Sequence, residues 1–273
     1  MMKVCIVSRV DFREPVETAQ SLGWMLADAG HEVVYEDAIA SELGYSGVSL
    51  SDPLFSADLI VVLGGDGSVL RAVRMLSRQG PIVGVNQGRV GFLTDLERDH
   101  AGEVLSGLSL PLPVEPRMRI SIECDGRPMG SALNEAVIVT SRPAKMLQFE
   151  TFINGRKSTE FRADGLIVGT PTGSTAYAMS AGGPIVDPSI EAFVLVPLAP
   201  FMLSSRPHLF SSSSEIEVRL ISSKPSQLVL DGQVQYDIGE EASLVVRKSP
   251  EPALFLDVGR SFFEKVEQKL RLL

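Results

Sequence analysis

The chain has 273 residues, of which 44% are hydrophobic and 22% are charged, and its formal net charge is −9. This composition argues against a disordered chain, and no apolar run approaches the ~20 residues that a membrane-spanning helix needs. The acidic balance and the lack of a basic run argue against nucleic acid and membranes as partners, while the length suggests roughly two domains.

The two cysteines, Cys5 and Cys124, lie far apart in strand-like segments. Two lone cysteines make neither a disulfide framework nor a zinc site, so we expect buried, reduced thiols. The short apolar run at the N-terminus is ended by Arg9 and Asp11 before a signal-peptide core could form. The sequence therefore predicts a cytoplasmic protein.

The first third of the sequence alternates strand and helix patterns. In chain order, these cover residues 3–10, 15–30, 31–37, 57–63, 68–80 and 81–86. Pro15 stands where the first helical residue of its segment would be, and Gly30 where the residue after the helix would be. Strands separated by helices predict right-handed βαβ units and a Rossmann-like parallel sheet with helices on its faces.

The pattern changes near residue 110, where a proline-rich stretch resembles a linker. Beyond it short strands with turn signals dominate, and they cover residues 118–124, 131–141, 147–155, 161–169, 214–222, 227–233 and 242–248. Apolar residues alternate in several of them, for example Met118, Ile120 and Ile122. This alternation predicts an antiparallel β-sandwich domain.

These patterns divide the chain into three parts. We expect an α/β domain with the glycine loop over 1–112 and a β-rich, dinucleotide-binding domain over 113–252. The last part, 253–273, holds a strand and an amphipathic helix with Phe262 and Val266 on its apolar face. We expect this helix to pack back on the first domain.

A glycine loop follows directly on the apolar strand 57–63. It reads Gly64-Gly65-Asp66-Gly67, and a helix is expected to begin near Ser68. Glycines let backbone N–H groups approach a ligand, and a helix N-terminus adds unpaired N–H donors, so the loop suits an anion. It is neither a P-loop, since no Lys-Ser/Thr pair follows, nor the spaced GxGxxG of a Rossmann loop.

Asp66 is the unusual member of this loop, because it is an anion where another anion would bind. One interpretation is that Asp66 caps the helix. The other is that it is a metal ligand or a general base beside a phosphate, where a bound cation offsets the repulsion. Spacing alone leaves both open.

Two further segments place polar groups at strand ends. The stretch NQGRVGFLTD, 86–95, follows strand 81–86, where an open α/β sheet binds ligands, although it could be a structural turn. Asn134 and Glu135 open an otherwise apolar strand. Asn suits the edge of an adenine or a nicotinamide amide, and Glu accepts from ribose hydroxyls or ring amines. The end of a turn is the alternative interpretation.

The segment 161–188 is the longest motif, and it is rich in glycines and hydroxyl side chains. A strand meets a Pro-Thr-Gly-Ser-Thr turn, and a short helix is expected near Ser174, where hydroxyls and N–H groups suit phosphate or ribose oxygens. Tyr177 could stack on a base. Arg162 and Asp164 lie two apart and could share one strand face and one ligand. The alternative is a purely structural corner.

In this order, the motifs GGDGS, NQGRVGFLTD, NEAVI, RADGLIVGTPTGSTAYAMSAGGPIVDP and DGQ closely resemble those of the bacterial NAD kinase family, over about residues 60–235. The first motif alone is also similar to the loop of diacylglycerol and sphingosine kinases and of phosphofructokinases. The resemblance implies the NAD kinase fold and transfer of the γ-phosphoryl group of ATP to the 2′-hydroxyl of the adenosine ribose of NAD. It also implies ATP as the donor, a divalent metal ion, expected to be magnesium, and a homodimer or homotetramer.

The resemblance implies roles for single residues as well. Asp66 would accept the proton of the 2′-hydroxyl. The phosphates of ATP would face Gly64, Gly65, Gly67 and Ser68. The residues expected to bind NAD are Asp66, Gly67, Arg71, Asn134, Glu135, Lys145, Arg162, Asp164, Thr175, Ala176, Tyr177, Ala178, Met179, Ser180, Ala199 and Gln233. The resemblance leaves the metal ligands unassigned.

Three positions depart from the family pattern. Ser68 stands where threonine is commoner, Gly169 where serine is usual, and Phe201 where bacterial relatives often carry a histidine. Ser68 keeps the hydroxyl, whereas Phe201 puts in doubt any contact or subunit interaction that the histidine makes.

Two other functions stay open. A lipid kinase could share the glycine loop, although the sequence lacks a basic or apolar membrane-docking helix. A catalytically silent dinucleotide sensor would need no base, although Asp66 is retained.

Overall fold

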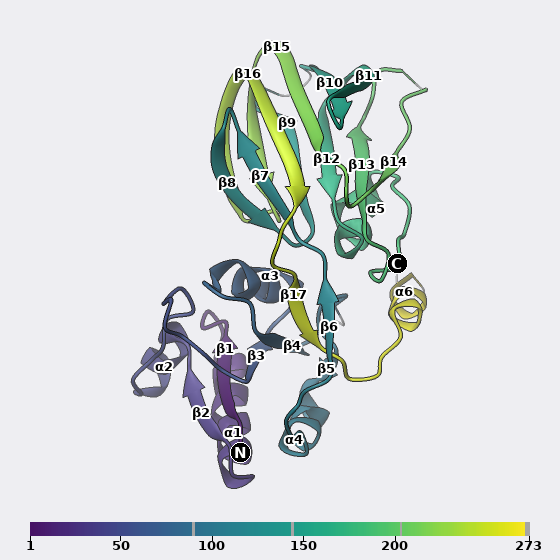
Figure 1. Cartoon of the computed structure of the whole chain (residues 1–273). Coiled ribbons are helices and arrows are strands. Elements are labelled where there is room, and N and C mark those ends of the chain that lie inside the picture. The colour runs from purple at the N-terminus through teal and green to yellow at the C-terminus, as the bar shows by residue number, and fades with distance from the viewer. Residues whose placement is uncertain (89–90, 143–144, 203, 271–273) are drawn as a thin grey trace. The chain divides into compact units, whose positions relative to one another are not determined.

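The computed structural model describes residues 1–88, 91–142, 145–202 and 204–270, and they form two compact units (Figure 1). Unit 1 comprises Met1–Pro116 and the chain from Ala253 onward, and unit 2 comprises Arg117–Pro252. The domain boundaries expected from the sequence stay predictions. Within the described chain, no helix is both long and apolar enough to cross a membrane.

Unit 1 is built around a seven-stranded sheet with the order β2-β1-β3-β4-β17-β6, to which β5 is added beside β4. Its elements are β1 (Lys3–Ser8), α1 (Arg13–Asp28), β2 (Glu32–Tyr35), α2 (Asp37–Leu43), β3 (Leu59–Leu63), α3 (Asp66–Met75), β4 (Pro81–Asn86), β5 (Leu96–Glu97), α4 (Arg98–Ser106), β6 (Val114–Arg117), β17 (Ala253–Leu256) and α6 (Phe262–Leu270). The pairs β1–β2, β1–β3, β3–β4 and β4–β17 are parallel. Every residue of β3 is buried, which explains its uninterrupted apolar sequence.

The predicted elements of this unit exist, with different ends. Helix α1 begins at Arg13, so that Pro15 is its third residue, and Gly30 follows it with φ +87° as expected. Helix α3 begins at Asp66 and ends at Met75, not at Gly80, because the next residues leave the helical path. The N–H of Ser77 donates to the carbonyl of Leu50 instead of to a helical carbonyl. The short helices α2 and α4 were not predicted.

Unit 2 is a ten-stranded sheet of antiparallel pairs with the order β14-β13-β12-β9-β15-β16-β7-β8, and β10 and β11 branch from β15. Its elements are β7 (Ile120–Cys124), β8 (Arg127–Ala132), β9 (Glu135–Thr140), β10 (Leu147–Ile153), β11 (Arg156–Ala163), β12 (Gly165–Gly169), the 3₁₀ turn η1 (Thr172–Thr175), α5 (Tyr177–Ser180), β13 (Ala192–Leu198), β14 (His208–Ser211), β15 (Ile216–Leu230) and β16 (Val234–Lys248).

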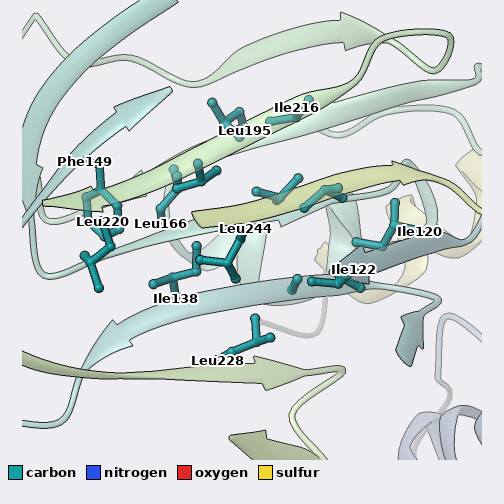
Figure 2. Packing of buried hydrophobic residues seen from close by; sticks show 14 of the residues in the cluster. Ile120, Ile122, Ile138, Phe149, Leu166, Leu195, Ile216, Leu220, Leu228 and Leu244 are labelled. Carbon is teal, nitrogen blue, oxygen red and sulfur yellow. The ribbon is translucent and has the colours of Figure 1, made fainter. Parts of the chain in front are cut away.

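The long strand β15 turns this sheet into a sandwich. Its first half pairs with β10 and its second half with β9, so the sheet divides into two branches whose side chains meet in one core. Figure 2 shows Phe149, Leu166, Leu220 and Leu228 among the side chains of that core. Met118, Ile120 and Ile122 all belong to it, so their predicted alternation is confirmed. The predicted α/β unit with a parallel sheet and the β-sandwich are both confirmed.

Two predicted strands are interrupted. The predicted strand 131–141 divides at Leu133 and Asn134, whose N–H groups donate to the carboxylate of Asp231 and not to a neighbouring strand. The predicted strand 161–169 divides at Asp164. Conversely, the predicted strands 214–222 and 227–233 are both parts of the single strand β15, apart from residues 214–215 before it and 231–233 after it. The buried strand β13 was not predicted.

We expect Phe149→Ala to lower the free energy of unfolding by about 3–5 kcal/mol, because it leaves a cavity in the sandwich core. Phe149 is 0% exposed, and its ring centroid lies 5.4 Å from that of Phe161. Urea denaturation followed by circular dichroism measures the change. Ile221→Ala on β15, where the side chain is 40% exposed, is the control and should change stability by less than about 0.5 kcal/mol. Equal losses in the two variants would contradict this account of the core.

Candidate active site

The glycine loop links the end of β3 to the first turn of α3. Gly64 has φ +157°, and a Cβ there would lie 2.3 Å from the hydroxyl oxygen of Ser68, so only glycine fits. Gly65 is the N-cap residue of α3. A Cβ added at Gly65 or Gly67 would have no atom within 4 Å, which leaves open space beside the backbone. The loop therefore combines a helix N-terminus with room for a ligand.

Asp66 is the first residue of α3, and its side chain does not cap the helix. Its Oδ2 accepts the N–H of Phe92 and its Oδ1 accepts the N–H of Leu93, each at 2.9 Å. A Cβ at Gly91 would lie 1.9 Å from Asp66 Oδ1, so the second motif approaches the carboxylate with its bare backbone. The capping interpretation is wrong, and Asp66 joins the glycine loop to the stretch after β4.

The C-terminal helix α6 brings two lysines to the same place. Lys269 Nζ lies 3.8 Å from Asp66 Oδ2 and 3.9 Å from the centroid of the Phe92 ring. Lys265 forms an ion pair with Asp95, and both side chains are more than nine-tenths buried. Neither lysine was predicted as a site residue. The available signal was their spacing of four residues on an amphipathic helix, which places them on one face.

A cleft of about 470 Å³ opens beside Gly64 and Gly65 at the carboxyl ends of β1, β3 and β4. The strand order reverses between β1 and β3, which is where an open parallel sheet binds ligands. Arg9 and Arg13 supply cations to its lining, and their present partners, Asp11 and Glu17, form only exposed pairs. Neither arginine was among the predicted residues. Exposed pairs of this kind are weak, so both guanidinium groups can turn to a ligand.

In unit 2, Asp231 organises the Asn–Glu motif. Its carboxylate accepts the N–H groups of Leu133, Asn134 and Glu135 at 2.9, 2.7 and 3.1 Å. The DGQ motif and the NE motif are thus two parts of one structure, although they lie almost 100 residues apart. Gln233 continues the same turn, where its N–H donates to the carbonyl of Leu230.

The side chains of this turn are buried without full hydrogen bonding. Asn134 Oδ1 and Glu135 Oε2 have no hydrogen-bond partner in the described part of the chain, although the residues are only 7% and 5% exposed. Burial raises the pKa of Glu135 to about 8, and the nearby charge of Asp231 adds to the shift. Burial also raises the pKa of Asp231, against the effect of the three N–H donors. Unpartnered buried acceptors are rare, and they mark a place where a ligand can donate.

The Pro-Thr-Gly-Ser-Thr corner supports this turn from behind. Thr170 donates its hydroxyl to the carbonyl of Leu133 and its N–H to the carbonyl of Asn134, at 2.6 and 2.8 Å. The hydroxyl of Ser174 bonds to the backbone of Val186. The corner is therefore structural in part. After it, Thr175 is buried whereas Tyr177 is 48% exposed and available for stacking.

The other predicted residues of unit 2 lie on several different elements. Arg162 is exposed on β11, with its guanidinium carbon 5.3 Å from the ring centroid of Phe201, whereas Asp164 lies in the bend between β11 and β12. The two therefore do not sit within one strand. Ala199 follows β13 with φ +44°, and Lys145 is exposed. The remaining predicted residues, Ala176, Ala178, Met179 and Ser180, lie at the start of α5 and along it.

Arg71 is the predicted dinucleotide contact on α3. Its guanidinium pairs with the buried carboxylate of Glu36 at 3.3 Å, and the other oxygen of Glu36 accepts the N–H of Ala38 at the start of α2. Its side chain is 41% exposed, so part of the guanidinium faces solvent. Its role toward a ligand stays a prediction.

The residues suit a metal ion that arrives with phosphates better than a resident one. Among the described residues, no group of three His, Cys, Asp or Glu side chains could hold an ion. Magnesium is commonly bound by one or two carboxylates together with substrate phosphates. The glycine loop, where such phosphates would lie, is the candidate place for an ion of that kind.

Comparison with known proteins covers both units. The profile of the ATP-NAD kinase N-terminal domain matches residues 4–110, and that of the ATP-NAD kinase C-terminal domain matches residues 133–258. A NAD kinase from Methanocorpusculum labreanum is 74% identical over 272 residues, which span 100% of each chain.

Two solved structures are similar to this one over nearly the whole chain. The crystal structure of an NAD kinase from Archaeoglobus fulgidus in complex with ATP has a TM-score of 0.83 and 32% identity, with 100% of both chains covered. The crystal structure of yeast NADH kinase complexed with NADH has a TM-score of 0.90 at 24% identity, covering 99% of this chain and 88% of the other. At 24% identity, the similarity to the yeast enzyme shows a common fold only.

We expect Gly173→Ala to destabilise the protein by roughly 1–3 kcal/mol and to weaken dinucleotide binding, because the added Cβ would lie 2.1 Å from the carbonyl oxygen of Asn134. Thermal unfolding and calorimetric titration with NAD measure the two effects. Gly107→Ala, where the nearest atoms would be at an ordinary 3.7 Å, is the matched control. If both variants bound NAD equally well, the close approach would not matter for the site.

The raised pKa of Glu135 predicts that stability falls as the pH rises from about 5 to 8. The native carboxyl keeps its proton up to a pKa of about 8, whereas the unfolded one loses it near 4.5, so the native state binds more protons in this window. The loss is up to about 1.4 kcal/mol per pH unit. Glu135→Gln should flatten the dependence, as measured by urea denaturation at several pH values.

Glu160→Gln is the control for this measurement, because Lys157 lowers the pKa of that exposed carboxyl. Its titration lies below the window, so the slope between pH 5 and 8 should stay that of the wild type. An unchanged slope in Glu135→Gln would show that Glu135 is not the group responsible.

Proposed function

The chain belongs to the ATP-NAD kinase family, and on that premise we propose that it transfers the γ-phosphoryl group of ATP to the 2′-hydroxyl of the adenosine ribose of NAD. The family predicted from the motifs is confirmed. The relatives reported above include archaeal NAD kinases and no bacterial one, which corrects the bacterial affiliation expected from the motifs. The observation that carries the proposed mechanism is the position of Asp66, which belongs to the glycine loop and accepts two hydrogen bonds from the second motif.

The cleft beside Gly64 and Gly65 supports ATP as the donor. The first turn of α3 offers backbone N–H groups, and Arg9 and Arg13 offer guanidinium groups that suit phosphates. The similar NAD kinase from Archaeoglobus fulgidus was solved in complex with ATP. A divalent ion bound with ATP would offset the charge of the phosphates.

The Asn–Glu turn of unit 2 supports a dinucleotide as the acceptor. The unpartnered oxygens of Asn134 and Glu135 need donors, and a ribose hydroxyl or a base amine can supply them. Because the pKa of Glu135 is about 8, its carboxyl is largely protonated at neutral pH and can itself donate. The exposed ring of Tyr177 suits stacking on a base.

In the proposed step, the 2′-hydroxyl oxygen attacks the γ-phosphorus, its proton passes to Asp66, and the bond to the β–γ bridging oxygen breaks to release ADP. Each oxygen of Asp66 accepts one backbone hydrogen bond, and a carboxylate oxygen has a second acceptor site that remains for the hydroxyl. General-base assistance contributes about 10²–10⁴ in rate. Most of the remaining rate enhancement comes from positioning and charge neutralisation, because the protein takes little part in the covalent chemistry of phosphoryl transfer.

We also propose a cytoplasmic homodimer or homotetramer. Burial raises the pKa of Cys5 to about 12 and that of Cys124 to about 11, so both thiols stay protonated and unreactive, as suits a reducing compartment. Phe201 and Met202, at 66% and 57% exposed, offer apolar surface for a subunit contact. Sedimentation of the purified protein tests the assembly, and a monomer would contradict it.

The two alternatives predict different products. A lipid kinase would phosphorylate diacylglycerol, and a silent sensor would bind NAD without forming NADP. The profiles that match both units favour NAD as the acceptor and favour turnover. A dehydrogenase-coupled assay for NADP, run with NAD or NADH and with ATP or polyphosphate, separates these outcomes and defines the donor and acceptor preferences.

We expect Asp66→Asn to lower kcat by at least about 10²-fold while NAD binding is retained, because an amide cannot accept the proton. The coupled assay and calorimetry measure these two quantities. Asp37→Asn is the matched control, because Asp37 is likewise the first residue of a helix but is exposed on α2. Full turnover in Asp66→Asn would remove Asp66 from its role as the base.

A further inference from the structure

The glycine loop lacks the cation that phosphate loops usually carry. In a P-loop a lysine follows the glycines and reaches the phosphates, whereas here Gly67 is followed by Ser68, Val69 and Leu70. The first basic residue after the loop, Arg71, pairs with the buried carboxylate of Glu36. The loop itself therefore supplies no side-chain cation to the transferring phosphoryl group.

Helix α6 is anchored to unit 1 by a buried ion pair. Lys265 and Asp95 have 5% and 9% of their side chains exposed, and the N–H of Asp95 donates to the carbonyl of Gly84 in β4. Removing either charge would leave the other buried and unpaired, which is strongly unfavourable. The pair therefore fixes α6 at the carboxyl end of the central strands.

One turn further along, α6 presents Lys269 to the proposed base. The ammonium lies 3.8 Å from Asp66 Oδ2, and it also lies 3.9 Å from the ring centroid of Phe92. The N–H of Phe92 donates to the same carboxylate oxygen. The side chain of Lys269 is 24% exposed, and an ammonium has three donors, so it can bind a further anion without leaving its present neighbours.

We propose that Lys269 is a catalytic residue that binds the phosphoryl group during its transfer, and that it then binds the 2′-phosphate of the product. This inference rests on the proposed function. Asp66 takes the proton of the 2′-hydroxyl, and the ammonium of Lys269 offsets the charge on the non-bridging phosphoryl oxygens. The ring of Phe92 holds the ammonium in place through its π face. The lysine missing from the glycine loop is thus supplied by the C-terminal helix.

The first experiment measures turnover. Lys269→Met should lower kcat by about 10²-fold or more, with the KM for NAD changed by less than about threefold, because the charge acts on the transferring group. Lys269→Arg should restore most of the activity, since it restores the charge. Gln268→Met, an exposed neighbour on the same helix, is the matched control and should keep wild-type turnover. Wild-type kcat in Lys269→Met would overturn the inference.

The second experiment is independent of turnover. Calorimetric titration of Lys269→Met with NADP and with NAD should show NADP affinity reduced by about tenfold and NAD affinity unchanged within about twofold, because only NADP carries the 2′-phosphate. Equal losses for the two dinucleotides, together with a lower melting temperature and no rescue by arginine, would make Lys269 merely structural. A wild type that forms no NADP would overturn the proposed function instead, and the two failures are therefore distinguishable.

Discussion

The carboxylate of Asp66 joins two segments that would otherwise be separate loops. Its two hydrogen bonds to Phe92 and Leu93 hold the stretch after β4 against the first turn of α3. Gly91 in that stretch follows from this contact, since a Cβ there would collide with Asp66 itself. Gly84 in β4 is equally constrained, because a Cβ there would lie 2.6 Å from the carbonyl oxygen of Leu93. Asp66 therefore fixes the backbone of the second motif from Gly91 to Leu93.

In unit 2 an aspartate also binds backbone N–H groups of a distant segment, but this aspartate is buried. Asp231 accepts three backbone N–H groups and is thereby able to fix the turn that carries Asn134 and Glu135. The cost of this arrangement is desolvation: burial raises the pKa of both Glu135 and Asp231, and the charge of Asp231 adds to the shift of Glu135. A carboxyl that is held protonated in this way becomes a donor as well as an acceptor, which suits recognition of a ligand with hydroxyl and amine groups.

The sequence predicted those features that depend on local pattern. The apolar strand β3, the glycine after α1 and the alternation of Met118, Ile120 and Ile122 all appear as expected, because strand and helix periods are local properties. It missed contacts between segments far apart in the chain, such as Asp66 with Phe92. The sequence also predicted two strands where β15 is a single one. The residues at the register shift between Ile221 and Ser226 have the composition of a turn.

The same reasoning explains why the lysines of α6 were overlooked. A lysine on an amphipathic helix ordinarily lies on the solvated face, and it is buried only where an acidic side chain pairs with it. Lys265 is buried because it forms an ion pair with Asp95. The whole of unit 2 separates these two residues in the sequence. Periodicity carries no information about such a pair.

The chain order of unit 1 has a consequence for its chemistry. The glycine loop and Asp66 are made early in the chain, whereas β17 and α6 follow unit 2 and complete the sheet and the site. The entropic cost of closing such a long insertion grows only slowly with its length, so the discontinuity is thermodynamically tolerable. It does mean that residues 1–116 alone would lack β17, the buried Lys265–Asp95 pair and the cation beside Asp66. Asp66 and Lys269, which we propose to act together, therefore come into contact only when α6 has packed against unit 1.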